Sequence, residues 1–510
     1  MMSFLKGFER PSKKQFIYLL IFRIINAYLL RTYYAADEYW QSTEIAHNDV
    51  FGYGYKSWEW TREAPLRSPL YVFIFSTMYN ILKYTSLDFP ILVAYLPKLI
   101  AATQAATFDY FLLKIVYVYF GQTHVLPAMI LHLTNWYSLF AIPRLIFNVL
   151  EMTLFAITLY FYKLSISKNF KTFDYISRIV ATINFIAKPT SIIPLTLIWP
   201  YRLFTMPGKI KDKIEYFFLN VFTVLVMIVS SLLVDVLYYK RFTWTVYNFF
   251  EFNFLEAGSS LYGTHHKFWY VTECIPYLLL GSVVFFAIGL VKYVSDQLNK
   301  RAGLDLIIFM IYFILVLSLS AHKEDRFLLP LWPLFMLFTC YGCVQLKSSR
   351  YLKYLLFISI ISNIGLFAFM GIHHQRGAFS VVDSLRQQGD RVKSVYFFTE
   401  CHQTPYYSFV HKNIYMDFPD CKPENRIKGS DSSKLFKYPQ EFIKNIIESQ
   451  NPSHIIILNH FTRDQNVAKI LEKHRYQKIA EHGHAMFIDS PIGTINDVTM
   501  ILMEKQDLQK

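Results

Sequence analysis

Long blocks of apolar residues are the feature that most limits what this chain can fold into. Clear examples are residues 217–237, 274–291, 304–320, 327–344 and 354–370. Each block has about the length, roughly 20 residues, with which a helix spans the core of a bilayer. Only 17% of the residues are charged, against about 25% in soluble proteins. The sequence therefore predicts a polytopic α-helical membrane protein with about 10–13 spans.

The basic residues lie mainly in short loops between these blocks, which predicts the side of the membrane for each loop. The formal net charge of +14 is therefore no sign of nucleic-acid binding. A cytosolic cluster precedes the first apolar segment, 16–34, and consists of Lys6, Arg10, Lys13 and Lys14. We interpret that segment as an uncleaved signal anchor. The first loop, about 35–69, and the tail after residue 370 then lie on the far side, the lumen in an endoplasmic-reticulum protein.

The tail differs in kind from the rest of the chain. Short β-like runs alternate in it with helical patterns, at residues 392–398, 440–449, 454–458, 464–474 and 476–488. We predict a membrane-embedded domain over residues 1–371 and a small luminal α/β domain over 372–510. In an oxidising lumen Cys401 and Cys421 can form a disulfide, with two free thiols as the alternative.

Ionisable residues gather on this predicted luminal face. Asp37 and Glu38 follow the first span, and the same loop contains Glu59 and Arg67. A second group occupies a luminal turn between two spans and consists of His322, Lys323, Glu324 and Arg326. Such groups are costly at a membrane boundary, so their concentration on one face predicts a functional site. The alternative is that each is a solvated loop charge.

The segment Asp37-Glu38-Tyr39-Trp40 is the sharpest local pattern. A carboxylate between aromatic rings at a helix end can have a shifted pKa and act as a general base. The alternative is a membrane-interface anchor, because Trp and Tyr collect at interfaces.

Several cations are candidates for binding a phosphate group. Arg makes bidentate contacts with phosphate and Lys acts as a point charge. The candidates are Arg67, Arg144, Lys188, His322, Lys323 and Arg326. For the turn at 322–326 the alternative is a cluster that neutralises itself, and for Lys188 it is a side chain that reaches the headgroups. There is no Walker loop and no zinc-ligand spacing. Asp-x-Asp is missing from the luminal loops, and we expect no metal and no cofactor.

The first loop resembles that of glycosyltransferase family 22. The resemblance rests on Asp37-Glu38-Tyr39-Trp40-Gln41-Ser42, Phe51-Gly52-Tyr53-Gly54-Tyr55, Trp58-Glu59-Trp60 and Leu66-Arg67-Ser68. His322-Lys323-Glu324 with Arg326-Phe327 resembles the second signature of that family. In the tail, the run from Cys401 to Ser408, with His411, resembles the third mannosyltransferases of glycosylphosphatidylinositol (GPI) anchor synthesis. Two departures are Ala35-Ala36 in place of His-Pro, and Lys188-Pro189-Thr190 in place of Arg-Pro-Thr.

This resemblance implies a GT-C fold, a luminal active site and dolichyl-phosphate-mannose as donor. It further implies inverting transfer of the third mannose, in an α1,2 link, to the GPI precursor in the endoplasmic-reticulum membrane. Asp37 matches the catalytic acid of the family and Glu38 its neighbour, and either can be the base. Trp40, Glu59 and Glu324 are further site candidates. The alternatives are an N-glycan mannosyltransferase of the same family and a membrane transporter.

Overall fold

The computed structural model describes residues 11–61, 63–168, 171–256, 258–299, 304–423 and 429–506, so Lys6 and Arg10 lie outside the described residues. Contacts divide the chain into two compact units. The first consists of Met1–Ala27, Glu59–Tyr71 and Lys98–Phe367, and the second of Tyr28–Trp58, Val72–Pro97 and Ala368–Lys510. The predicted division cuts the chain once, at residue 371. The division by contacts instead groups separate segments and assigns most of the loop 35–69 to the same unit as the tail.

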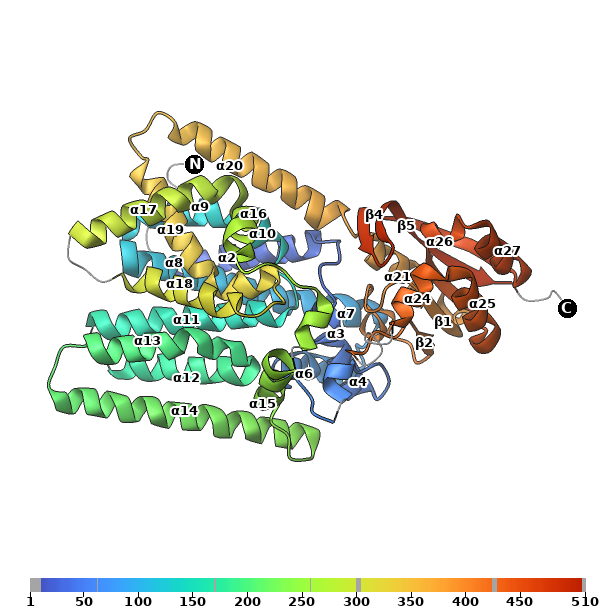
Figure 1. Cartoon of the computed structure of the whole chain (residues 1–510), viewed down its shortest axis with the longest axis horizontal. Coiled ribbons are helices and arrows are strands. Elements are labelled where there is room, and N and C mark those ends of the chain that lie inside the picture. The colour runs from blue at the N-terminus through green and yellow to red at the C-terminus, as the bar shows by residue number, and fades with distance from the viewer. Residues whose placement is uncertain are drawn as a thin grey trace. The chain divides into compact units, whose positions relative to one another are not determined.

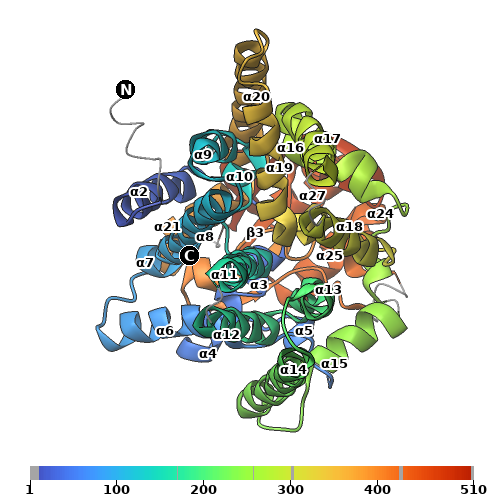
Figure 2. The same cartoon turned by 90° about the vertical axis from the view of Figure 1, so that its left-hand side faces the viewer.

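The first unit is a helical bundle (Figures 1 and 2). Its longer helices are α2 (Lys13–Leu29), α8 (Pro97–Phe120), α9 (Val125–Leu133), α11 (Phe147–Lys168), α12 (Lys171–Ala187), α13 (Ile192–Thr205), α14 (Ile210–Tyr239), α17 (Val283–Asn299), α18 (Asp305–Ser318), α19 (Trp332–Gln345) and α20 (Leu352–Phe367). Shorter pieces connect them: α5 (Trp58–Thr61), α10 (Trp136–Phe140), η2 (Pro189–Ser191), α15 (Thr245–Phe250), α16 (Ile275–Leu279) and η7 (Asp325–Leu331). Lys188-Pro189 ends α12, because proline cannot continue a helix from within.

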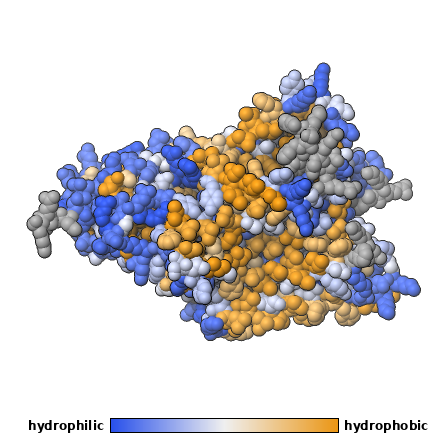
Figure 3. Space-filling view, turned by 180° about the vertical axis from the view of Figure 1, so that it is seen from behind, coloured by the Kyte–Doolittle hydropathy of each residue, from blue (hydrophilic) through white to orange (hydrophobic). Residues whose placement is uncertain are grey.

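Six helical segments of the described residues are long and apolar enough to cross a membrane, and α18 is a shorter apolar helix. Apolar side chains also cover the outside of the bundle. On α14, Phe218 is 63% exposed and Leu225 is 54% exposed, and Figure 3 shows a broad hydrophobic surface over the helical part of the molecule. A soluble protein rarely exposes such an area. The chain is a multi-pass membrane protein, and the predicted number of 10–13 spans stays a prediction.

Two glycines bring α17 and α19 into close contact. A Cβ atom on Gly289 would lie 1.8 Å from the carbonyl oxygen of Phe338, and one on Gly342 would lie 2.0 Å from that of Phe285. Membrane helices associate through such small residues, because the hydrophobic effect does not drive them together within lipid.

The second unit combines helices from the first hundred residues with a C-terminal sheet. The helices are α3 (Asp37–Trp40), α4 (Thr43–Phe51), α6 (Leu70–Tyr84), α7 (Pro90–Tyr95), α21 (Gly377–Gln387), α22 (Tyr407–Val410), α24 (Asp431–Lys437), α25 (Pro439–Gln450), α26 (Asn459–Thr462) and α27 (Gln465–Lys473). The strands are β1 (Ser394–Phe398), β2 (Tyr415–Asp417), β3 (His454–Leu458), β4 (Tyr476–Ser490) and β5 (Gly493–Lys505).

The sheet has the order β2-β1-β3-β5-β4. Strands β2, β1 and β3 are parallel, and β5 pairs antiparallel with β3 and β4. All five residues of β3 are buried, as expected for a central strand rich in isoleucine. The sequence correctly predicts β1, β3, β4, α25 and α27 of this α/β domain. It missed β2, which is only three residues long, and β5.

Candidate active site

The Asp37 segment forms α3, a helix of one turn in the second unit. Asp37, its first residue, is partly exposed, whereas Glu38 is buried, with 4% of the residue exposed. The two adjacent carboxylates therefore differ in accessibility. A general base must come within hydrogen-bond distance of the proton that it removes, so accessibility bears on which of the two residues can act as one.

Trp40 connects α3 to the C-terminal part of the second unit. Its indole Nε1 donates a hydrogen bond to the carbonyl oxygen of Thr404 at 3.0 Å. The ring centroid of Trp40 lies 4.1 Å from that of His402 and 5.0 Å from that of Tyr406. With 3% of its surface exposed, Trp40 is a packed residue of this unit and not a side chain at a membrane interface.

Glu44 in α4 is fully buried and was not among the predicted site residues. Its carboxylate accepts hydrogen bonds from the backbone N–H of Tyr406 at 2.9 Å, from that of Ser408 at 3.0 Å and from the Ser408 hydroxyl at 2.6 Å. Burial raises the pKa of Glu44 to about 7, although these hydrogen bonds oppose the shift. The only signal for Glu44 in the sequence was its position one helical turn after the aromatic residue Trp40. The partners of Glu44 lie far along the chain, so this signal did not identify them.

His47, three residues after Glu44, pairs with His411. Its Nε2 lies 2.9 Å from His411 Nδ1, and its Nδ1 lies 3.2 Å from the carbonyl oxygen of Tyr53. His411 in turn lies 3.9 Å from a carboxylate oxygen of Asp88. Burial, with a smaller contribution from His411, lowers the pKa of His47 to about 3. Both imidazoles are therefore neutral at physiological pH, as burial lowers the pKa of His411 as well.

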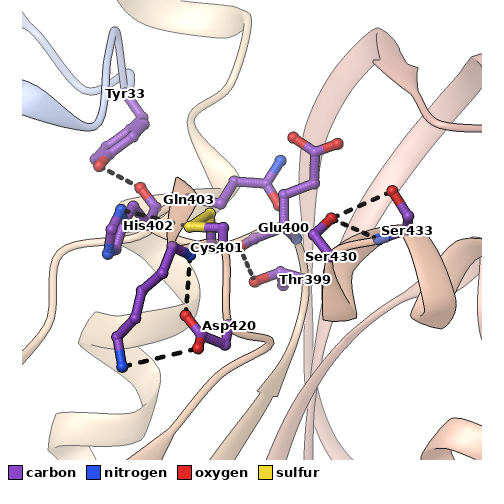
Figure 4. Close-up of a disulfide and its surroundings, with 11 residues drawn as sticks. Tyr33, Thr399, Glu400, Cys401, His402, Gln403, Asp420, Ser430 and Ser433 are labelled. Atoms are coloured by element: carbon purple, nitrogen blue, oxygen red, sulfur yellow. Dashed lines mark hydrogen bonds and ion pairs between the residues drawn. A yellow bond between two sulfur atoms is a disulfide. The ribbon is translucent and has the colours of Figure 1, made fainter. Parts of the chain in front are cut away.

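Cys401 and Cys421 form a disulfide, the pairing that the sequence predicted. Figure 4 shows it beside His402, whose carbonyl oxygen accepts a hydrogen bond from the Tyr33 hydroxyl at 2.6 Å. Potential ligand atoms of Cys401, His402 and Cys421 lie within 4.8 Å of one another. The two sulfur atoms are bonded to each other, so in this oxidised form they offer no thiolate to a metal ion.

The buried groups Glu44 and His47 predict two opposing effects of pH on stability. Folding raises the pKa of Glu44 from 4.5 to about 7, so its contribution is present below pH 4.5 and is lost as the pH rises through 7. Folding lowers the pKa of His47 from 6.5 to about 3, so its contribution is present above pH 6.5 and is lost as the pH falls. Between pH 7.5 and 5.5 the two changes are each on the order of 1–2 kcal/mol and of opposite sign.

We therefore expect acidification from pH 7.5 to 5.5 to destabilise Glu44→Gln relative to the wild type and to stabilise His47→Gln relative to it. Thermal unfolding of the purified full chain at the two pH values measures both differences. A pH dependence of the same sign in the two variants would contradict the assigned shifts.

The first unit contains the second predicted cluster. Glu324 forms ion pairs with Arg326 and, at 3.0 Å, with His322. Burial would raise the pKa of Glu324, but the Arg326 charge and the hydrogen bonds from Arg326 and His322 outweigh it and hold the pKa below its usual range. His322 is also held at 2.8 Å from the carbonyl oxygen of Gly263. Glu324 thus orients both an imidazole and a guanidinium group.

Lys188 lies in the same unit and is only 8% exposed. Its Nζ is 3.3 Å from a Glu151 carboxylate oxygen, and the other oxygen of Glu151 accepts a hydrogen bond from Thr190 at 2.7 Å. Burial lowers the pKa of Lys188, Glu151 opposes this, and the charges of Arg67 and Arg326 add to it. Arg67 and Arg326 are thus each close enough to Lys188 to act on it electrostatically.

The remaining predicted residues of the first unit occupy different surroundings. Arg67 forms an ion pair with Glu59 at 2.5 Å. Lys323 donates to the carbonyl oxygens of Ser320 at 2.5 Å and His265 at 3.3 Å. Arg144 is buried and donates from Nε to the carbonyl oxygen of Phe140 at 2.7 Å. The structure therefore places Arg67 and Arg326 near Lys188, while Lys323 and Arg144 each donate to backbone carbonyl oxygens.

The chain is similar to known mannosyltransferases. The model of the Alg9-like mannosyltransferase family matches residues 15–411. A mannosyltransferase of Arabidopsis thaliana is 30% identical over 93% of this chain and 89% of its own length. The GPI alpha-1,2-mannosyltransferase 3 of Homo sapiens is 30% identical over 94% of this chain and 86% of its own.

The fold has a counterpart among solved structures. The crystal structure of ArnT from Cupriavidus metallidurans, bound to undecaprenyl phosphate, superposes with a TM-score of 0.61 over 96% of this chain and 97% of that one. The sequence identity is 10%, so the likeness concerns the fold alone. The GT-C fold predicted from the sequence is confirmed.

Proposed function

The chain belongs to the Alg9-like mannosyltransferase family, and from that premise we propose that it adds the third mannose, in an α1,2 link, to the GPI precursor. The donor is dolichyl-phosphate-mannose. The observation that carries the proposal is the identity with GPI alpha-1,2-mannosyltransferase 3 of Homo sapiens over 94% of this chain. Such a share is too large to leave out the C-terminal sheet, so the likeness extends beyond the helical bundle.

The enzyme works at the luminal face of the endoplasmic-reticulum membrane in this proposal. The support is the distribution of basic residues, which predicts that the Asp37 loop and the C-terminal domain lie on the side opposite the basic loops. Both substrates are anchored in the membrane by lipid. Their reacting groups therefore meet at the interface, and a membrane-embedded enzyme gains rate by orienting them.

Asp37 is the general base that removes the proton from the acceptor hydroxyl. Asp37 is a partly exposed residue, whereas Glu38 is buried. Transfer from a β-linked donor to an α-linked product inverts the anomeric centre. A single displacement of this kind needs one base on the acceptor and no protein nucleophile.

The donor phosphate binds to the cations of the first unit, chiefly Arg67, Lys188 and Arg326. Glu151 and Glu324 hold two of these cations in place through ion pairs. Fixed positive charges stabilise the negative charge that develops on the departing dolichyl phosphate. Because this leaving group carries a single phosphate, the reaction requires no metal ion to neutralise a diphosphate.

The test is transfer by the purified chain from dolichyl-phosphate-mannose to a GPI precursor that bears two mannoses. We expect a product with one added hexose that an α1,2-specific mannosidase removes. The matched acceptor is a lipid-linked N-glycan precursor. Transfer to that acceptor, with none to the GPI precursor, would contradict the proposed substrate and support the N-glycan alternative.

A further inference from the structure

Three side chains that follow Asp37 within ten residues of the chain contact one segment of the C-terminal domain. This segment, residues 401–411, is called the docking segment. Trp40 bonds to Thr404, Glu44 to Tyr406 and Ser408, and His47 lies against His411. All of these residues belong to the second unit. Glu44 and His47, three residues apart in α4, share one face of the helix.

We infer that the docking segment holds α3 and α4 in the position in which Asp37 reaches the acceptor, and that Trp40, Glu44 and Ser408 are positioning residues for mannosyl transfer. This inference rests on the proposed function, and it assigns to the C-terminal domain a role in the reaction itself.

The contact of Glu44 is the strongest of the three. A carboxylate without solvent is costly to bury unless hydrogen-bond donors surround it. Ser408 supplies two donors, its hydroxyl and its backbone N–H, and Tyr406 supplies a third. Separation of α4 from the docking segment would leave these buried polar groups without their partners. The contact therefore fixes the position of α4 against the docking segment.

The contacts of Trp40 hold Asp37 in place. Trp40 and Asp37 are the last and first residues of the same helical turn, α3. Because the indole is bonded to Thr404 and lies against His402, the turn cannot rotate without breaking both contacts. A base that is displaced by about 1 Å can cost as much as 10²-fold in rate.

The docking segment is itself held at both ends. The disulfide ties Cys401 to Cys421, and the Tyr33 hydroxyl bonds to the carbonyl oxygen of His402, as Figure 4 shows. At the other end, Ser408 lies in the short helix α22, which follows β1 of the sheet. The C-terminal sheet is therefore the support on which the segment is built.

The test compares Ser408→Ala with Ser408→Thr, which keeps the hydroxyl, and with Ser449→Ala, which alters an exposed serine of α25. We expect Ser408→Ala to lower kcat about tenfold or more, with little change in KM for dolichyl-phosphate-mannose. Ser408→Thr should recover most of the loss, and Ser449→Ala should match the wild type.

A double-mutant cycle with Asp37→Asn separates positioning from a general loss of folded protein. If Ser408 acts through Asp37, Ser408→Ala has little further effect once Asp37 is replaced. If it only destabilises the chain, the two losses multiply, and the inference is overturned. A wild-type rate in Ser408→Ala would overturn it as well.

Hydrogen exchange tests the docking role without a measurement of mannosyl transfer. In the purified full chain, Ser408→Ala should increase exchange over residues 37–48 while exchange in the C-terminal sheet stays unchanged. Unchanged exchange over 37–48 would contradict the docking role. Absence of transfer by the wild type would instead contradict the proposed function, and the exchange result would still stand on its own.

Discussion

Asp37→Asn is expected to lower the rate of mannosyl transfer by on the order of 10³-fold while the chain stays folded. The change removes the group that accepts the proton from the acceptor hydroxyl but keeps the shape of the side chain. Asp37 is partly exposed at the start of α3, so its replacement leaves no cavity. The measurement is single-turnover transfer from dolichyl-phosphate-mannose to the two-mannose GPI precursor, together with the melting temperature of the variant.

The matched control is Glu38→Gln, because Glu38 is the neighbouring carboxylate and is buried. If Asp37 is the base, Glu38→Gln should lower the rate only through loss of stability, and any loss of rate should come with a lower melting temperature. A folded Asp37→Asn variant with nearly normal turnover would exclude Asp37 as the base. A folded Glu38→Gln variant with the full 10³-fold loss would move that role to Glu38.

Asp109→Ala is expected to destabilise the first unit by about 3–5 kcal/mol, because it leaves a buried charge without its partner. Arg23 donates to both carboxylate oxygens of Asp109, from Nε at 2.6 Å and from Nη2 at 2.8 Å. The Arg23 and Asp109 side chains are 0% and 1% exposed. Thermal unfolding in detergent and the yield of folded chain measure the effect.

Two further variants test the cause. The double change Arg23→Met with Asp109→Leu removes both charges and should recover much of the lost stability. Lys171→Ala breaks the exposed ion pair between Lys171 and Glu215 and should change the melting temperature little. A double variant as unstable as Asp109→Ala would show that packing, and not the unpaired charge, causes the loss.

The same network shows why geometry alone does not identify a site. Asp109 Oδ1 lies 2.8 Å from His132 Nε2, and His132 Nδ1 lies 2.9 Å from the Ser138 hydroxyl. These are the spacings of a catalytic triad. All three residues are buried among helices, with exposures of at most 1%, so no substrate reaches the hydroxyl. The arrangement is a polar core of the bundle that also satisfies Arg23.

Local patterns predicted much of the molecule. The apolar blocks indicated the membrane class, and the β-like runs at 454–458 and 476–488 indicated strands that the structure contains. The motifs at Asp37 and at His322–Arg326 indicated glycosyltransferase family 22, which the match to the Alg9-like model confirms. Short-range patterns suffice here because the length of an apolar helix and the composition of a β-like run depend on neighbouring residues alone.

The partners of buried charges could not be predicted in the same way. Glu44 and Ser408 are 364 positions apart in the chain, and Arg23 and Asp109 are 86 apart. No periodicity connects residues at such distances. Glu44 was therefore one carboxylate among several in the first loop, and the motif around Ser408 had no assigned role.

By itself the sequence determined that this chain spans a membrane repeatedly and that it belongs with the mannosyltransferases, because composition and local motifs carry both conclusions. Only the tertiary structure decided which of the adjacent carboxylates Asp37 and Glu38 is accessible, and which of the scattered cations lie together. The physical reason is that burial and charge pairing arise from contacts between distant segments. The long-range hydrogen bonds of Glu44 and the ion pair between Lys188 and Glu151 exist only once the chain has folded.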